Sequence, residues 1–230
     1  MKDNKTILVV AAHPDDEVLG CGGSIARFAK EGHEVHILIM ADGESSRVSD
    51  ISLIAPELLD ARNESAKRAC KVLGCSSVTV LNLPDNRLDG LERLDIVKLI
   101  EVFIDKYLPS TVFTHYGGDV NIDHRIVHDA VITACRPQPN CPVKELLFFE
   151  IPSSTEWRPQ SSVECFFPNY FVDISSTLSV KIEALRAYES ELRVFPHPRS
   201  IKAIEALIRW RGATVGVNAA EGFIIGRIIV

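Results

Sequence analysis

The sequence lacks the features that mark several large classes of protein. None of its six cysteines forms a CxxC pair, which argues against a zinc ribbon and against a disulfide framework, so we expect free thiols in a reducing compartment. No stretch approaches the roughly 18 uninterrupted apolar residues that a membrane span needs, since the best candidate, GFIIGRIIV at 222–230, contains Arg227. Internal repeats and low-complexity tracts are also missing. These absences predict a soluble, cytoplasmic protein.

An excess of positive charge is missing as well. The chain has 25 lysines and arginines against 31 acidic residues, a net charge of −6, so general affinity for nucleic acid is not expected. Its first apolar run, in MKDNKTILVV, ends at His13 and Pro14 and not at a small-residue cleavage site, which favours a strand over a signal peptide. The sequence neither indicates nor excludes a homo-oligomer.

Apolar runs alternate with longer amphipathic stretches along the 230 residues. This alternation predicts an α/β fold with a single doubly wound, mostly parallel sheet of the Rossmann-like kind, flanked by helices. We expect one domain over 1–230, with a loop excursion at 152–169 and a C-terminal elaboration at 170–230. The expected strands are 6–12, 34–41, 77–83, 110–115, 145–151 and 170–174, and the expected helices are 18–32, 56–74, 91–108, 123–136, 175–192 and 200–216.

The stretch HPDDE, residues 13–17, follows the first strand directly. Ligands of such sheets bind outside the carboxyl ends of the strands, so this stretch stands where a site is expected. Acids at a helix start also complement the helix dipole, but capping needs one acid and explains neither His13 nor Pro14. An imidazole and a carboxylate, joined by a second histidine from another loop, form the ligand set of a catalytic zinc site.

A second polar loop supplies candidate histidines. In DVNIDHRIVHDA, residues 119–130, His124 opens a helix after a strand, and His128 follows one helical turn later on the same face. We expect at least one of the two to bind a metal.

A dinucleotide-binding loop is the competing interpretation of the first stretch, because Gly20, Gly22 and Gly23 precede an acid, Asp42, at the next strand end. These glycines lie inside the first helix, however, whereas the fingerprint needs its first glycine in the turn after the strand. The turn also holds carboxylates, which would repel a pyrophosphate. A dinucleotide oxidoreductase is therefore disfavoured, and a non-catalytic sugar- or nucleotide-binding α/β domain remains the alternative to an enzyme.

HPDDE, the following GGSIARFAKEGHEVHILIMADGE and the later DHR together resemble the PIG-L/LmbE-like family of zinc-dependent N-acetyl amino-sugar deacetylases. The resemblance continues through ARNESAKRACKVLG, LNLPDNRLD, DISSTLSVKIEALRAYESEL and VGVNAAEGF, and so covers nearly the whole chain. It implies a hydrolase that removes an acetyl group from an amino sugar that is free, nucleotide-linked or part of a glycoconjugate.

The resemblance also implies roles for single residues. His13, Asp16 and His124 correspond to the ligands of one catalytic Zn²⁺ ion, and Asp15 corresponds to the general base. Arg62, in the ARNESAKR helix, matches an arginine that the family places near the substrate. Zinc lowers the pKa of a bound water and polarises the acetamide carbonyl, and a neighbouring carboxylate takes up the proton.

The second loop departs from the family pattern. Many members read HxDH, whereas this chain reads NIDH, with Asn121 in place of the first histidine. Asparagine cannot donate a proton in that way, although its amide can hydrogen-bond an oxyanion of the substrate. The general acid is therefore Asp15 returning its proton, His128 or His115. We favour Asp15 in both roles, with Asp123 as an orienting partner of a histidine.

The ADGESSR loop follows another strand and is expected to face the same cleft. It carries Asp42, Glu44 and Arg47, of which Arg47 is expected to hold a phosphate or a sugar hydroxyl of the substrate. Glu17 is either a partner of the site or a helix-start acid. The sequence does not indicate which sugar is processed.

Overall fold

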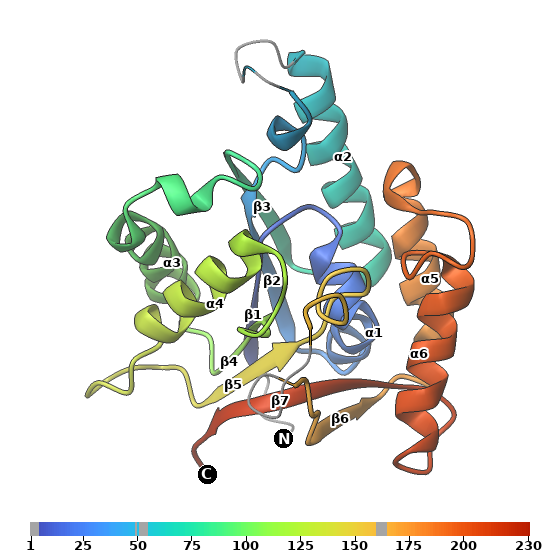
Figure 1. The fold of residues 1–230 in the computed structure, drawn as a ribbon. Coiled ribbons are helices and arrows are strands. Elements are labelled where there is room, and N and C mark those ends of the chain that lie inside the picture. Colours follow the sequence, from blue (N-terminus) through green and yellow to red (C-terminus); the bar gives the residue numbers. More distant parts are fainter. Residues whose placement is uncertain (1–4, 49, 51–54, 160–164) are drawn as a thin grey trace.

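The computed structural model describes residues 5–48, 50, 55–159 and 165–230, so residues 160–164 of the expected excursion lie outside the described part. Seven strands form one sheet in the order β3-β2-β1-β4-β5-β7-β6 (Figure 1). The strands are β1 (Thr6–Ala11), β2 (Glu34–Ala41), β3 (Ser77–Leu83), β4 (Thr111–His115), β5 (Glu145–Phe149), β6 (Tyr170–Asp173) and β7 (Ala220–Ile228). The main helices are α1 (Asp16–Lys30), α2 (Pro56–Leu73), α3 (Arg93–Tyr107), α4 (Ile122–Ala134), α5 (Leu178–Arg186) and α6 (Ile201–Ala213).

The expected α/β class is confirmed, because β1 to β5 pair in parallel and the helices lie against both faces of the sheet. The sequence did not predict β7, which pairs antiparallel with both β5 and β6. Glycine is depleted in strands, and two glycines interrupt this apolar run. Gly226 lies where a Cβ atom would come within 2.6 Å of the Phe148 ring, so the strand needs a glycine there to pair closely.

Two apolar cores lie on opposite faces of the sheet. Side chains of α1, α2, α5 and α6 pack on one face, and those of α3 and α4 pack on the other (Figure 1). The central strands β1 and β2 are buried on both sides, which explains their continuous apolar sequence. No helix in the described part of the chain combines the length and the apolar character that crossing a bilayer requires.

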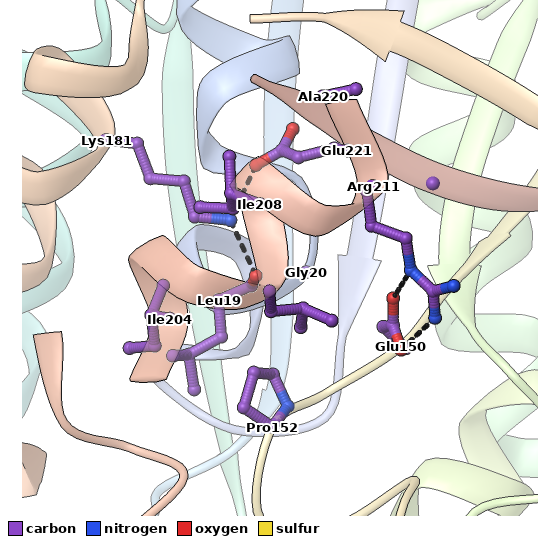
Figure 2. Close-up of a pocket in the computed structure, with 12 residues that line it drawn as sticks. Leu19, Gly20, Glu150, Pro152, Lys181, Ile204, Ile208, Arg211, Ala220 and Glu221 are labelled. Carbon is purple, nitrogen blue, oxygen red and sulfur yellow. Dashed lines mark hydrogen bonds and ion pairs between the residues drawn. The ribbon is translucent and has the colours of Figure 1, made fainter. Parts of the chain in front are cut away.

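Helix α1 is broken in its middle at Cys21, whose backbone φ of −145° is not helical. The break separates the Gly23 amide from its usual acceptor, the Leu19 carbonyl. A buried ion pair takes over both groups. Glu221 accepts from the Gly23 amide at 2.9 Å. Lys181 Nζ donates to the Leu19 carbonyl at 2.7 Å (Figure 2). Lys181 Nζ and Glu221 Oε1 lie 2.6 Å apart, so each charge is neutralised in the core.

The glycines of this helix allow close packing behind the first loop. A Cβ atom on Gly20 would come within 2.4 Å of the Phe149 ring, and one on Gly23 within 2.5 Å of Ile174. The first half of α1 can therefore lie directly against β5.

The sheet order places the two polar loops side by side. From β1 the chain continues to β2 and β3 on one side of the sheet, and it then returns to β4 on the other side of β1. The direction of strand succession therefore reverses between β1 and β4. A crevice forms at such a switch point, outside the carboxyl ends of the two strands. The loop after β1 and the loop after β4 meet there.

Candidate metal centre and active site

Three side chains from the two loops converge at the switch point. Asp16 Oδ2 lies 3.2 Å from His13 Nδ1 and 3.2 Å from His124 Nε2, and the two ring nitrogens are 3.3 Å apart. His13 comes from the loop after β1, Asp16 opens α1, and His124 lies in the first turn of α4. All three are buried. The structure thus brings together the three residues that the sequence analysis assigned as metal ligands.

The donor set fits a metal ion. Burial opposes ionisation of Asp16, but the charge and hydrogen bonds of the two histidines hold its pKa well below the usual range. Burial likewise opposes protonation of His124, yet Asp16 and Asp119 raise its pKa to about 9. The second oxygen of Asp16 is buried and has no hydrogen-bond partner among the described residues. The environment of Asp16 and His124 therefore favours positive charge. A divalent cation would supply that charge, with the ring nitrogens as ligands.

Further carboxylates hold the outer nitrogens of both imidazoles. His124 Nδ1 lies 3.2 Å from Asp119 Oδ1, and His13 Nε2 lies 3.1 Å from Asp123 Oδ2 and 3.0 Å from Asp85 Oδ1. Metal-binding histidines usually donate their other N–H to such an acceptor, which fixes the ring and its tautomer. Asp123, predicted to orient a histidine, thus lies within hydrogen-bond distance of His13.

Sequence reasoning missed the other two carboxylates. Asp119 belongs to the same DVNIDHR segment as His124, and Asp85 belongs to the LNLPDNRLD segment. An acid a few residues before a ligand histidine was an available signal for Asp119. The placement of Asp85 depends on the loop after β3 and could not be read from spacing.

Asp15 lies between His13 and Asp16, the two candidate ligands of the first loop. Its φ of 118° is rare for a residue with a side chain. Its main-chain amide donates to Glu17 Oε2 at 3.1 Å, and the Tyr188 hydroxyl donates to Glu17 Oε1 at 2.6 Å. Arg199 Nη1 lies 3.0 Å from Asp15 Oδ2. Burial raises the pKa of Asp15 to about 7, against the opposing charge of Arg199.

Three arginines, Arg47, Arg62 and Arg199, gather on this side of the site, and we call them the arginine cluster. Arg62 Nε donates to Glu44 Oε1 at 2.5 Å, and Arg62 also pairs with Glu191. Arg47 Nη2 lies 2.7 Å from Glu191 Oε1, and Arg199 Nη1 lies 3.6 Å from Glu191 Oε2. The ADGESSR loop is therefore linked to Asp15 through Glu191 and Arg199, neither of which was predicted.

Asn121 caps helix α4. Its side-chain oxygen accepts from the main-chain amides of Asp123 at 2.8 Å and His124 at 3.3 Å. Its amide nitrogen donates to Asn86 Oδ1 at 3.0 Å. The residue that replaces the family histidine thus stands beside the candidate ligands and fixes the start of their helix.

His115 and His128, the two histidines considered as general acids, are poorly placed for that role. His115 Nε2 accepts from the Ala12 amide at 2.8 Å, so this nitrogen carries no proton to give. Burial and the neighbouring His124 lower the pKa of His115 well below the usual range. His128 Nδ1 bonds the His115 carbonyl at 2.7 Å, and its ring packs against Phe148. Neither observation supports proton transfer by these residues.

A separate small cavity lies between α1 and α6 (Figure 2). Its lining includes the Lys181–Glu221 pair and, near its edge, the two hydrogen bonds from Arg211 to Glu150. None of the candidate metal ligands lines it.

Comparisons with known proteins agree with the geometry. The sequence model of the family described as "PIG-L: GlcNAc-PI de-N-acetylase" matches residues 8–135. The chain is 32% identical over 192 residues to the "Uncharacterized deacetylase YaiS" of Escherichia coli, which covers 81% of this chain and 91% of that protein. It is 29% identical over 197 residues to the "Diacetylchitobiose deacetylase" of Thermococcus kodakarensis, over 82% of this chain and 71% of that protein.

Among solved structures, the N,N'-diacetylchitobiose deacetylase of Pyrococcus horikoshii superposes with a TM-score of 0.78 at 24% identity, over 98% of this chain and 85% of that chain. This likeness concerns the fold. The chain is also 27% identical to the "4-oxalmesaconate hydratase" of Pseudomonas putida, over 96% of this chain and 86% of that protein. Proteins similar to this chain therefore include a named hydratase as well as deacetylases.

Proposed function

Since the chain belongs to the PIG-L family, we propose that it is a metal-dependent hydrolase that removes the N-acetyl group from an amino sugar or an amino-sugar conjugate. The observation that carries the proposal is the convergence of His13, Asp16 and His124, with a buried carboxylate oxygen left without a partner. The outer nitrogens of both imidazoles are held by carboxylates, as in metal centres. A non-catalytic binding domain would not need this arrangement.

Zinc is the metal that we propose. Zinc bonds to nitrogen and oxygen are about 2.0–2.1 Å long in tetrahedral sites, so two ligand atoms of one ion stand about 3.3–3.4 Å apart. The three separations here are 3.2, 3.2 and 3.3 Å. Three protein ligands leave a fourth position for water or substrate, which is the arrangement of catalytic rather than structural zinc.

The residues around this centre have separate roles in the proposed reaction. When bound, the metal polarises the acetamide carbonyl and lowers the pKa of water. Asp15 takes a proton from the attacking water and returns it to the amine nitrogen as the C–N bond breaks, since a carboxyl group near pKa 7 serves in both directions. Asp123 orients His13.

We assign substrate binding to Arg47, Arg62 and Asn121. The two arginines belong to the cluster beside Asp15, and Arg47 is half-exposed. Asn121 presents its amide near the start of α4. The relatives named as chitobiose and glucosaminyl malate deacetylases support an N-acetylhexosamine, free or conjugated, as the substrate. The scattered cysteines, which include no CxxC pair, support a cytoplasmic location.

The test is an acetate-release assay with the zinc-loaded protein. The panel holds N-acetylglucosamine, N,N'-diacetylchitobiose, a nucleotide-linked N-acetylhexosamine and a glucosaminide conjugate, and metal-free protein is the control. We expect metal-dependent release of acetate from at least one compound. An unsaturated dicarboxylic acid is included because of the hydratase relative. Hydration of that acid without acetate release from any amide would overturn the proposal.

A further inference from the structure

We infer that Arg199 is a positioning residue for Asp15: it holds the carboxylate of the proposed base in its working orientation. The inference rests on the proposed function for the role of Asp15. Its structural part, the pairing of these two side chains, stands on the contacts alone. Arg199 lies outside the 8–135 segment that the family comparison matches.

The guanidinium group of Arg199 is fixed from several sides. Its Nε donates to Ser153 Oγ at 2.8 Å, and its Nη1 lies 3.0 Å from Asp15 Oδ2. The main-chain amide of Arg199 donates to His197 Nδ1 at 3.1 Å, which fixes the backbone that carries it. Its side chain is 22% exposed. An arginine tied at both backbone and Nε offers a rigid donor, unlike a solvated surface arginine.

Asp15 needs such a partner because it is buried. Its side chain is only 4% exposed, and Arg199 is the cation with the shortest contact to it. A buried carboxylate without a partner is costly and turns toward any available donor. Asp16, one residue later, keeps its own carboxylate among the histidines. Arg199 therefore draws the Asp15 carboxylate away from the imidazoles. As a result the two adjacent acids, Asp15 and Asp16, can have different roles.

The same chain segment also fixes the backbone of Asp15. Tyr188 donates to Glu17, and Glu17 accepts from the Asp15 amide. Residues 188–199 thus act on Asp15 twice, indirectly at its main chain through Glu17 and directly at its carboxylate through Arg199. A base must lie within hydrogen-bond reach of the proton that it takes, and small displacements lower the reaction rate. Both contacts therefore hold Asp15 in position.

The first experiment tests the pairing without any substrate. Thermal unfolding of the metal-free protein is measured for Arg199→Ala, Asp15→Asn and the double variant. We expect Arg199→Ala to lower Tm by about 2–8 °C in the original background and by much less with Asp15→Asn, because the neutral amide needs no counter-charge. Equal losses in the two backgrounds would overturn the inference.

The second experiment tests the role, with the best acetate-releasing compound of the panel as the probe. We expect Arg199→Ala to lower kcat about 10- to 100-fold with KM within about twofold and zinc content unchanged. Added methylguanidinium should restore part of kcat, and Arg199→Lys should fall between the two. Arg193→Ala is the matched control, since Arg193 lies on the same segment and its guanidinium donates, among the described residues, to the carbonyls of Ser190 and Leu192.

The outcomes separate the two proposals. A raised KM with unchanged kcat would make Arg199 a substrate-binding residue and would overturn the inference. A loss of kcat that methylguanidinium does not restore would indicate a general structural role and would also overturn it. If no compound releases acetate, the proposed function fails, and the unfolding experiment alone decides whether Arg199 holds Asp15.

Discussion

Replacement of Asp119 should weaken zinc binding although Asp119 contacts no metal in the proposed site. Its Oδ1 lies 3.2 Å from His124 Nδ1, and its Oδ2 accepts from Thr155 Oγ1 at 2.7 Å. The side chain is 1% exposed and so is closed off from bulk water. Loss of such an orienting carboxylate typically costs 10- to 100-fold in metal affinity, or about 1.4–2.7 kcal/mol. We expect the loss of zinc affinity to lie near the lower value for Asp119→Asn and near the upper value for Asp119→Ala.

The assay is competition for Zn²⁺ with a chromophoric chelator, which gives Kd directly. Asp129→Asn is the matched control, because Asp129 lies on the same helix as His124 and its half-exposed side chain pairs with Arg93. Its Kd should match that of the unaltered protein. A Kd for Asp119→Ala within twofold of the control would refute the reasoning that this carboxylate orients a ligand.

The same residue predicts a pH dependence of stability in the metal-free protein. Burial opposes ionisation of Asp119, but hydrogen bonds from His124, Ser154 and Thr155 outweigh it and lower its pKa to about 2. A lowered folded-state pKa stabilises the protein above the unfolded value near 4, by about 2 kcal/mol, and the gain is lost as pH falls toward 2. The Tm difference between the unaltered protein and Asp119→Asn should therefore shrink from pH 5 to pH 3. A constant difference would contradict this assignment.

Three further predictions follow from single contacts. Asp15→Asn should lower acetate release about 10²- to 10⁴-fold and keep its zinc; loss of zinc, measured by mass spectrometry, would make Asp15 a ligand instead. His124→Ala should lose zinc and His128→Ala should keep it, and the reverse result would show that the other histidine binds the metal. Lys181→Met leaves the Glu221 charge buried without its partner at 2.6 Å, which costs about 3–5 kcal/mol, or about 6–20 °C in Tm. A decrease below about 3 °C in a thermal melt would contradict it.

Much of the fold could be predicted because it depends on local pattern. The alternation of apolar and amphipathic runs predicted the parallel strands β1 to β5 and the helices between them, within a few residues at each end. Helix α1 begins at Asp16, two residues earlier than expected, because the turn after β1 is shorter than the sequence indicated. Strand β7 was missed since its two glycines serve close packing that only the folded sheet shows.

The candidate site was predictable only in part, for the same reason. His13, Asp16 and His124 follow strand ends in recognisable segments, and the sheet order brings them together. Glu191 lies in a short 3-10 helix and Arg199 in the loop before α6, and nothing in their spacing relates them to Asp15. Their contacts depend on how α5 and α6 pack against α1 and α2, which is a property of the tertiary structure.

The break in α1 has a consequence for the order of events during synthesis. The Gly23 amide, 198 residues before Glu221, obtains its acceptor only when β7 has left the ribosome and paired with β5. A nascent chain therefore carries every proposed zinc ligand long before it can complete the helix that presents Asp16. We therefore expect tight zinc binding only after β7 has paired with β5, because that pairing brings Glu221 to the broken helix.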